Sequence, residues 1–426
     1  MQRLSSVGEL DFGKYVGPGG SVLWGQACAE PRTLVRHLLA SHGLPEITAF
    51  IGIPVTDLLA AAHASPIRLT SYTGAGVNSV LHASGGLDIM PVHYSSIPNL
   101  IARGRIRADT VLVQVAGPGK SGRYSLGAAR DYLVAAIERA DTVIAEVSSG
   151  VPWTYGPPYL TEDDITVLLP SAEGPAELLA AAPSPVQEVI ATYAADLVED
   201  GATIQVGVGS LADAVLARLA SRRHLGVHSG QLTDGMVDLI EGGAVTGERK
   251  RVDRGLVIGG LLYGSSKLFS FADRNKAVCL RDARYTHDPV VLAVQYKFTA
   301  LNSALEVDLT GQVNAEVARG RYIGSVGGAV DFLRGAAASP GGLPVVMLPA
   351  TAGPASRVVM QLNGPVSTPR SDAGVVVTEH GVADLRGLTL AERAERMIAI
   401  AAPQFRDSLS SAADAALSAS KGARSL

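Results

Sequence analysis

The chain has 426 residues, of which 47% are hydrophobic and 18% are charged, and its formal net charge is −4. This composition supports a large buried core and argues against a disordered chain, while the mild acidity argues against a dedicated nucleic-acid binder. Two cysteines exclude a disulfide framework, and the few His and Cys residues form no cluster with the spacing of a zinc site, so no metal is expected.

The first residues contain no apolar segment of the kind found in a signal peptide, and the longest apolar run, 255–263, is too short to cross a membrane. A protein of a reducing compartment, the cytoplasm, is therefore expected, with no membrane partner. Downstream, the run 110–116 predicts a strand, 128–140 a helix and 141–148 a second strand. This βαβ rhythm predicts a mostly parallel sheet covered by helices.

Residues 170–185 are rich in Pro, Ala and Ser, and are interpreted as a linker between two α/β halves. The expected fold class is therefore α/β, with one domain over residues 1–183 and a second over 184–426. The second half begins with a predicted helix (186–199), a strand (203–206) and a helix that follows a glycine loop. Near the end, a helix is predicted from 390 to about 409, and the low-complexity tail behind it is expected to fray.

Two glycine loops are candidate ligand-binding loops, because glycine leaves backbone N–H groups free to face a ligand oxygen. The first loop precedes a helix, for which Ser210 is a candidate N-cap residue, and it equally fits a plain strand–helix turn. In the second loop Asp331 is followed by Arg334 at i+3, and a solvated ion pair is the simplest interpretation. The candidate binding residues are Gly207, Val208, Gly209, Ser210, Gly324, Val326, Gly327, Gly328 and Asp331.

Several titratable or nucleophilic side chains are candidates for catalysis, although each also fits a purely structural role. His228 and Ser229 follow a short apolar run and resemble a base and a nucleophile, but neighbours in sequence rarely point at each other. Glu379 and His380 form a second pair. Further candidates are Glu30, Glu306 and Asp308, and Cys28, which is more typical of a small apolar packing residue.

Seven ordered segments together resemble the acetyl-CoA hydrolase/transferase family, which includes the 4-hydroxybutyrate and butyryl CoA-transferases. The resemblance covers about residues 15–410 and rests on the segments 90–100, 113–127, 200–215, 225–247, 301–316, 324–336 and 375–387. It implies two open α/β domains with an acyl-CoA cleft between them, in a homodimer. A CoA thioester is then the substrate, and no permanently bound cofactor is expected.

In the transferases of this family, the resemblance implies a glutamate that attacks the acyl-CoA carbonyl and forms a glutamyl-CoA thioester. Its His-Thr/Ser-Glu-Met segment matches residues 228–231 here, and the nucleophile position is Gly230. A glycine has no carboxylate, so this chain departs from the family at the residue that carries the covalent chemistry. Other polar family positions also differ, at 116–119, 148, 329 and 402.

The sequence therefore predicts an acyl-CoA-dependent enzyme in which a small acceptor or water attacks the thioester directly. His228 is the nearest candidate base, with Glu379 and His380 as further candidates. Three other functions stay open: a conventional CoA-transferase that uses another carboxylate such as Glu306, a lyase or isomerase acting on an acyl-CoA, and a non-catalytic acyl-CoA binder. A further interpretation, as a nucleotide-dependent oxidoreductase, is supported only by the Gly207-x-Gly209 pattern.

Overall fold

The first sheet is built from residues 2–170 in the computed structural model, which describes residues 1–59 and 67–422. Its strand order is β1-β8-β7-β6-β2-β3-β4-β5, and all neighbours are parallel. The strands are β1 (Gln2–Arg3), β2 (Ser21–Trp24), β3 (Ile47–Ile51), β4 (Ile67–Ser71), β5 (Leu87–Ile89), β6 (Thr110–Val115), β7 (Thr142–Val147) and β8 (Val167–Pro170). The sequence of β6, TVLVQV, is buried at every position, as a parallel strand with helices on both faces must be.

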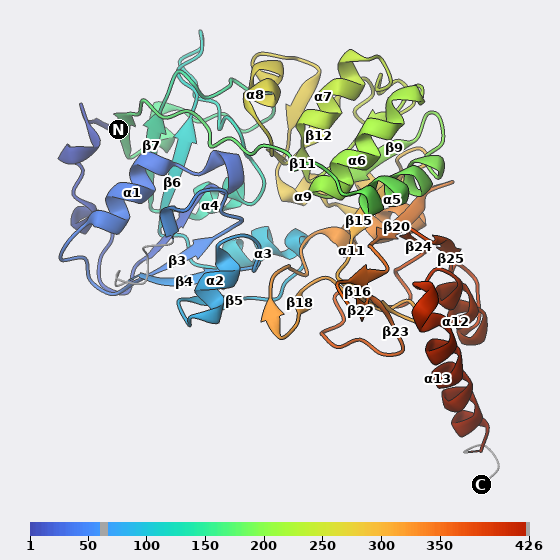
Figure 1. The fold of residues 1–426 in the computed structure, drawn as a ribbon. Helices are drawn as coiled ribbons and strands as arrows, with labels where there is room; N and C mark the ends of the chain where they lie inside the picture. Colours follow the sequence, from blue (N-terminus) through green and yellow to red (C-terminus); the bar gives the residue numbers. More distant parts are fainter. Residues whose placement is uncertain (60–66, 423–426) are drawn as a thin grey trace.

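Helices cover both faces of this sheet (Figure 1). They are α1 (Arg32–Ala40), α2 (Asn78–Ala83), α3 (Ile97–Ala102) and α4 (Leu133–Arg139). Val22 of β2 packs in one apolar cluster with α1 and α2, whereas Leu23 packs in another with α3 and α4. Because successive strand residues point to opposite faces, this separation places two helices on each side of the sheet.

The second sheet takes residues 203–384 in the order β10-β9-β15-β20-β24-β25, and only β25 is antiparallel to its neighbour. Its strands are β9 (Thr203–Val206), β10 (Gly226–Val227), β15 (Thr299–Ser303), β20 (Leu343–Met347), β24 (Val375–Thr378) and β25 (Gly381–Asp384). The apolar cluster on one face includes side chains of α5 (Pro185–Asp196), α6 (Ser210–Arg218) and α7 (Asp234–Glu241). The cluster on the other face includes α10 (Pro289–Ala293), α11 (Ala329–Ala338) and α12 (Leu390–Ala399).

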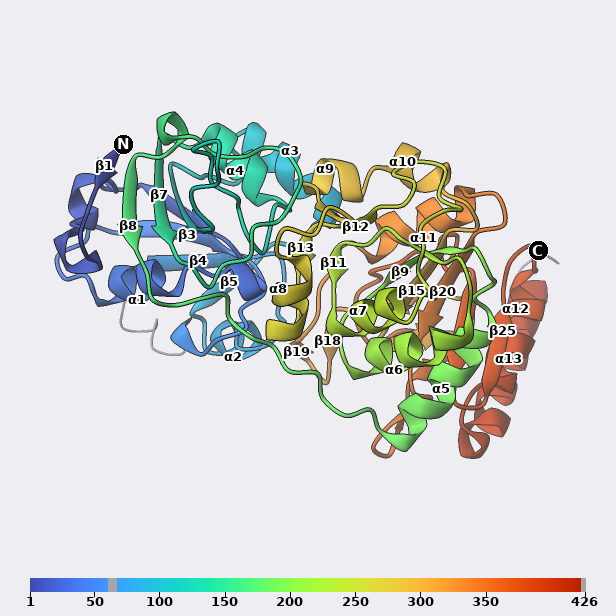
Figure 2. The same cartoon turned by 90° about the horizontal axis from the view of Figure 1, so that it is seen from above.

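The remaining elements complete the two halves, which lie side by side in Figure 2. The remaining strands are β11 (Gln231–Leu232), β12 (Val257–Gly259), β13 (Leu261–Leu262), β14 (Val278–Leu280), β16 (Glu306–Asp308), β17 (Val313–Asn314), β18 (Val317–Ala318), β19 (Arg321–Tyr322), β21 (Thr351–Ala352), β22 (Ala355–Ser356) and β23 (Val358–Val359). The remaining helices are η1 (Val7–Glu9), η2 (Phe12–Lys14), η3 (Ala27–Ala29), η5 (Tyr94–Ser96), η6 (Glu162–Asp164), η7 (Leu219–Ser221), α8 (Ser266–Ala272), α9 (Ala283–Thr286) and α13 (Pro403–Gly422). Among the described residues, no helix is long and apolar enough to span a membrane.

The mostly parallel α/β architecture is confirmed, and the structure corrects five local predictions. The helix expected over 128–140 begins only at Leu133, because the preceding residues pair with the second half through the Arg130 N–H to Gly260 C=O hydrogen bond of 2.9 Å. The helix expected over 390–409 is two helices, and the tail expected to fray is helical to Gly422. The N-cap of α6 is Gly209, not Ser210.

The fifth correction concerns the ion pair predicted on α11. Asp331 accepts hydrogen bonds from Ser95 of η5 instead, through the hydroxyl at 2.8 Å and the backbone N–H at 3.3 Å. Arg334 pairs with Asp372 at 2.8 Å. The carboxylate therefore attaches α11 to the N-terminal half, a contact that local spacing on one helix does not reveal.

Candidate functional site

Each sheet contains one point at which the strand order reverses, and the two points face a common cavity. In the first sheet the reversal is at β2, which lies between β3 and β6; in the second it is at β9, between β10 and β15. Loops that leave parallel strands on opposite sides of such a point diverge and open a crevice beyond the carboxyl ends of the strands. Gln26 follows β2, Gly207 follows β9, and Gly230 follows β10. All three residues line the cavity.

The cavity has a volume of about 280 Å³ and its walls come from both halves of the chain. The N-terminal half contributes residues between Gln26 and Tyr94, and the C-terminal half contributes residues between Gln205 and Phe332. Backbone hydrogen bonds close the junction beside it, from Gly74 N–H to Gly324 C=O at 2.8 Å and from Tyr94 N–H to Gly327 C=O at 3.0 Å. The expected interdomain cleft is therefore present as a cavity lined by both halves.

The N-terminal wall is a buried hydrogen-bond network centred on Gln26. Its amide nitrogen donates to the Tyr94 hydroxyl and to Asp131, both at 2.7 Å, and its amide oxygen accepts from Tyr72 at 2.9 Å and from the Ile53 N–H at 3.0 Å. Burial raises the pKa of Asp131 to about 6. A fully satisfied polar network of this kind fixes the ring positions of the two tyrosines, so this wall is rigid.

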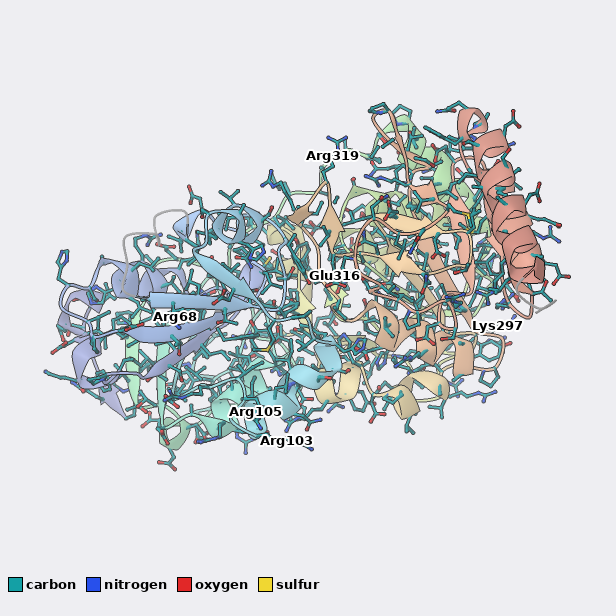
Figure 3. All side chains as sticks on the ribbon, turned by 90° about the horizontal axis from the view of Figure 1, so that it is seen from below. Arg68, Arg103, Arg105, Lys297, Glu316 and Arg319 are labelled. Carbon is teal, nitrogen blue, oxygen red and sulfur yellow. The ribbon has the colours of Figure 1, made fainter. Side chains whose placement is uncertain are left out.

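The second glycine loop forms the opposite wall, and Glu316 fixes it in place. The Glu316 carbonyl accepts from the Gly324 N–H at 3.0 Å, while its carboxylate accepts from the Tyr322 hydroxyl at 2.6 Å and from Ser367 at 2.7 Å. Glu316 lies between the two halves in Figure 3. A Cβ at Gly324 would come within 1.9 Å of the Ala315 carbonyl oxygen, so only glycine fits there. Gly324, Val326, Gly327 and Gly328 all line the cavity, as does Ser325.

Two helices begin beside the cavity, α11 at its wall and α6 at the adjoining groove. α6 begins at Ser210, after Gly207 and Val208 in the cavity wall, and α11 begins at Ala329, after Gly328. The first N–H groups of a helix have no partner within the helix. The two loops can therefore stabilise negative charge on an oxygen between them, such as the oxygen of a thioester carbonyl under attack.

Gly230 lies in the cavity wall beside the imidazole of His287, which follows α9. A Cβ at Gly230 would lie 3.3 Å from Cε1 and 3.4 Å from Nε2 of His287. A Cβ at Gly328 would lie only 2.5 Å from the same Nε2. Two glycines thus pack directly against one imidazole ring, which also contacts the tilted rings of Tyr94 and Phe332 at centroid distances of 4.9 and 4.5 Å.

His228 and Ser229 lie behind the cavity wall and do not line it. The His228 Nε2–H donates to the Thr286 carbonyl at 3.1 Å, and its Nδ1 accepts from Gln295 at 3.4 Å. Burial, with a smaller contribution from Lys250, lowers the pKa of His228 to about 3. The Ser229 hydroxyl points to the Val206 carbonyl at 3.4 Å. His228, which the sequence predicted as the nearest base, therefore holds the backbone immediately before His287, the histidine that lines the cavity.

The other candidate carboxylates are bound elsewhere. Glu379 accepts from the Ala350 N–H at 2.7 Å and lies 3.8 Å from the His380 ring, in the turn between β24 and β25. Glu306 binds the Asn363 backbone and side chain at 2.8 and 2.6 Å, and Asp308 closes the turn that follows it. Among the described residues that line the cavity there is no Asp, Glu, Lys or Arg, and His287 is the one imidazole.

A second hollow of about 620 Å³ continues from the cavity and shares Val208 and Tyr263 with it. Gly209 and Ser210 of the first glycine loop line this groove rather than the cavity. Its floor is apolar, with Leu178, Leu216 and Ala217 among its residues. Its lining also includes Asp213, Asp234 and Asp238, of which Asp238 pairs with Lys267. The two other carboxylates disfavour a diphosphate in the groove and tolerate an uncharged chain.

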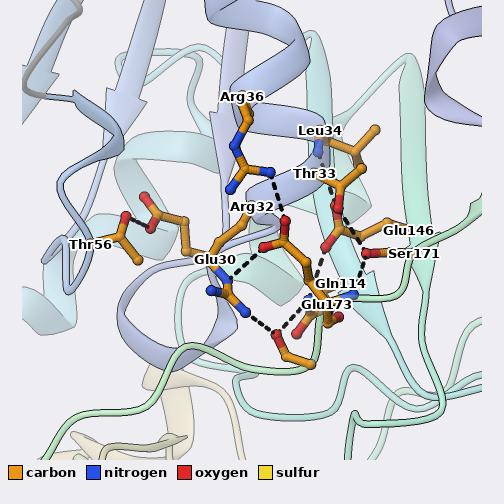
Figure 4. Close-up of polar contacts among 11 residues, drawn as sticks. Glu30, Arg32, Thr33, Leu34, Arg36, Thr56, Gln114, Glu146, Ser171 and Glu173 are labelled. Atoms are coloured by element: carbon orange, nitrogen blue, oxygen red, sulfur yellow. Dashed lines mark hydrogen bonds and ion pairs between the residues drawn. The ribbon is translucent and has the colours of Figure 1, made fainter.

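Glu30 belongs to the first half, near a buried network that ties α1 to the sheet (Figure 4). Its carboxylate accepts from the Thr56 hydroxyl at 2.5 Å. In the neighbouring network, Glu146 of β7 accepts from the Leu34 N–H at the start of α1 and from Gln114 of β6, both at 2.9 Å. Burial raises the pKa of Glu146 to about 7. None of these residues lines the cavity, so their role is structural.

Sequence reasoning missed the residues that the tertiary structure brings to the cavity from other elements: Gln26, Tyr72, Tyr94, His287 and Asn302. Gln26 could have been found, since it follows a strand at the reversal of the first sheet. His287 stands in the sequence THDP, whose local pattern signals only the end of one helix and the start of the next. Its proximity to Gly230 depends on a contact between residues 57 positions apart (287 − 230).

The comparisons with known proteins agree with this architecture. The family model of the acetyl-CoA hydrolase/transferase N-terminal domain matches residues 7–164, and that of the C-terminal domain matches residues 264–413. The chain is similar to the 4-hydroxybutyrate coenzyme A transferase of Clostridium kluyveri, with 37% identity over 91% of this chain and 92% of that protein. It is similar to a succinyl-CoA:acetate/propanoyl-CoA:succinate CoA transferase of Fasciola hepatica, with 35% identity over 96% and 88%. The crystal structure of RipA from Yersinia pestis superposes with a TM-score of 0.90 at 30% identity, over 97% of both chains.

Proposed function

The chain belongs to the acetyl-CoA hydrolase/transferase family, and we propose that it transfers an acyl group from an acyl-CoA directly to a small nucleophile or to water. The observation that carries the proposal is the absence of any carboxylate among the described residues that line the cavity, with Gly230 at its wall. A glutamyl-CoA thioester needs a carboxylate within bonding distance of the acyl carbon. Without one, the acceptor itself must attack the thioester.

The walls suit the binding of a thioester carbonyl. The N-termini of α6 and α11 supply backbone donors for the oxygen on which negative charge develops, and each such donor contributes about 10²–10³ to the rate. The apolar groove beyond Val208 is proposed to hold the uncharged pantetheine arm of CoA. A volume of about 280 Å³ corresponds to roughly nine water-sized groups at ~30 Å³ each, so a short acyl chain and a small acceptor are proposed.

The proposal is tested by looking for the covalent intermediate and for its kinetic consequences. Purified protein is incubated with acetyl-CoA and weighed by intact mass spectrometry, before and after borohydride, which reduces a glutamyl-CoA thioester to an alcohol and releases its CoA. We expect thiol release without any protein-bound CoA, and no exchange of labelled acetate into acetyl-CoA. A protein–CoA thioester on any residue, or rapid acetate exchange, would instead establish the conventional transferase mechanism.

The family resemblance also leads us to propose a homodimer with a site in each subunit. Light scattering on the purified protein measures the mass directly, and the chain mass of 44.0 kDa gives an expected value near twice that figure. A monomer that retains full thiol release would show that each cavity is complete within one chain.

A further inference from the structure

The imidazole of His287 is the one titratable nitrogen group among the described residues that line the cavity, and nothing in the family resemblance assigned it a role. Its side chain is almost fully enclosed, with 4% of the residue exposed. The ring edge that carries Nε2 faces the cavity between Gly230 and Gly328. A nitrogen in this position lies next to the space that a longer side chain at residue 230 would occupy.

The hydrogen bonds of His287 define which of its nitrogens carries the proton. Nδ1 lies 2.9 Å from the Thr286 hydroxyl, and that hydroxyl lies 3.3 Å from the Asp282 carbonyl oxygen. Both contacts are hydrogen bonds only if the hydroxyl donates to Asp282 and Nδ1–H donates to the hydroxyl. The lone pair is then on Nε2, the nitrogen beside the two glycines.

The environment keeps this imidazole neutral and holds it in place. Burial lowers the pKa of His287 to about 3, so the ring is uncharged at neutral pH and can accept a proton. The tilted rings of Tyr94 and Phe332 contact the imidazole. His228 binds the Thr286 carbonyl at 3.1 Å, which fixes the backbone immediately before the ring. A neutral imidazole held in this position has a lone pair that can accept a proton from a bound group, and it carries no charge with which to pair an anion.

We propose that Nε2 of His287 is the general base of this site, and that the acceptor is a small molecule with an O–H or N–H nucleophile, water included, rather than a carboxylate. This inference rests on the proposed function. The acceptor binds in the space beside Gly230 and transfers its proton to Nε2 as its oxygen or nitrogen bonds to the acyl carbon. The C–S bond then breaks, and the imidazolium returns the proton to the CoA thiolate, giving acylated acceptor and free CoA.

The same chemistry explains why a carboxylate acceptor is disfavoured. A carboxylate has no proton for His287 to remove, and no described cation lines the cavity to pair with its charge. Burial of an unpaired carboxylate among apolar and neutral polar groups is costly. An alcohol, an amine or water brings the proton that the imidazole is placed to take.

The test uses His287→Ala and His287→Asn beside the surface control His42→Gln, with acetyl-CoA as donor and water, glycerol, hydroxylamine or butyrate as acceptor. His42 is exposed in the loop after α1. We expect both His287 variants to lose at least about 100-fold in kcat while retaining the thermal shift caused by CoA. Added imidazole should restore part of the rate of His287→Ala, and butyrate should yield no butyryl-CoA in the wild type.

The outcomes separate this inference from the proposed function. If the wild type releases thiol by direct transfer and both His287 variants stay within threefold of it, the assignment of the base is wrong while direct transfer stands. If butyrate supports turnover without a protein–CoA thioester, the acceptor class is wrong. A protein–CoA thioester, or no thiol release with any of these acceptors, overturns both conclusions.

Discussion

The close approach of Gly328 to His287 gives the sharpest test of the cavity geometry. An alanine at residue 328 would place Cβ 2.5 Å from Nε2 and 2.8 Å from Cδ2 of the ring. Ordinary van der Waals contact begins at 3.4 Å, so the imidazole must move by 3.4 − 2.5, about 0.9 Å. The aromatic rings of Tyr94 and Phe332 limit the directions in which it can move.

A displacement of this size should affect the reaction and not the fold. Misplacing a catalytic group by ~1 Å costs about 10²-fold in rate, so Gly328→Ala is expected to reduce kcat by roughly that factor. Gly230→Ala is the matched comparison, because its Cβ would lie 3.3–3.4 Å from atoms of the same ring. The imidazole would then have to move by only a few tenths of an ångström. Neither glycine has the positive φ that only glycine adopts readily, so backbone strain does not separate the two variants.

The assay is thiol release from acetyl-CoA at saturating donor, with melting temperature and CoA binding measured on each variant. We expect Gly230→Ala to lose no more than about threefold, and Gly328→Ala to lose far more at a similar melting temperature. Equal rates in the two variants would refute the reasoning, because the position of the ring would then have no influence on catalysis.

Three further predictions follow from other parts of the molecule. Burial raises the pKa of Glu146 from 4.5 to about 7, so its contribution to stability is present below pH 4.5 and is lost as the pH rises to about 7. This loss amounts to about 3 kcal/mol. Glu146→Gln should therefore flatten the dependence of the free energy of unfolding on pH in that window, as measured by urea denaturation. An unchanged pH dependence in the variant would contradict this prediction. Ala217 is exposed in the groove that we propose for the pantetheine arm of CoA. Ala217→Trp should therefore raise KM for acetyl-CoA about tenfold or more with little change in kcat. An unaltered KM would show that CoA does not bind in the groove. Burial raises the pKa of the Cys28 thiol to about 12, so a thiol reagent at pH 8 should label this residue only after unfolding, and rapid labelling of the native protein would show that this part of the core opens.

Much of the fold could be predicted from the sequence, because its signals are local. The continuous apolar run of β6 indicates a strand buried on both faces, and the alternation of such runs with helical segments indicates parallel sheets. The two glycine loops were also identifiable, since each follows a strand or turn and precedes an amphipathic helix. Six of the nine residues predicted to bind substrate line the cavity, and Gly209 and Ser210 line the adjoining groove.

The tertiary structure alone decided which side chains face the cavity. His228 and His287 are both buried histidines whose pKa values are lowered by burial, and nothing in their neighbouring residues distinguishes them. The direction of each ring depends on packing between elements that are distant in the chain: Thr286 and Gln295 hold His228 behind the wall, while Gly230 and Gly328 leave room for His287 at its surface. The sequence by itself determined that residue 230 is a glycine and offers no carboxylate, and the folding of the chain determined which group lies beside that position.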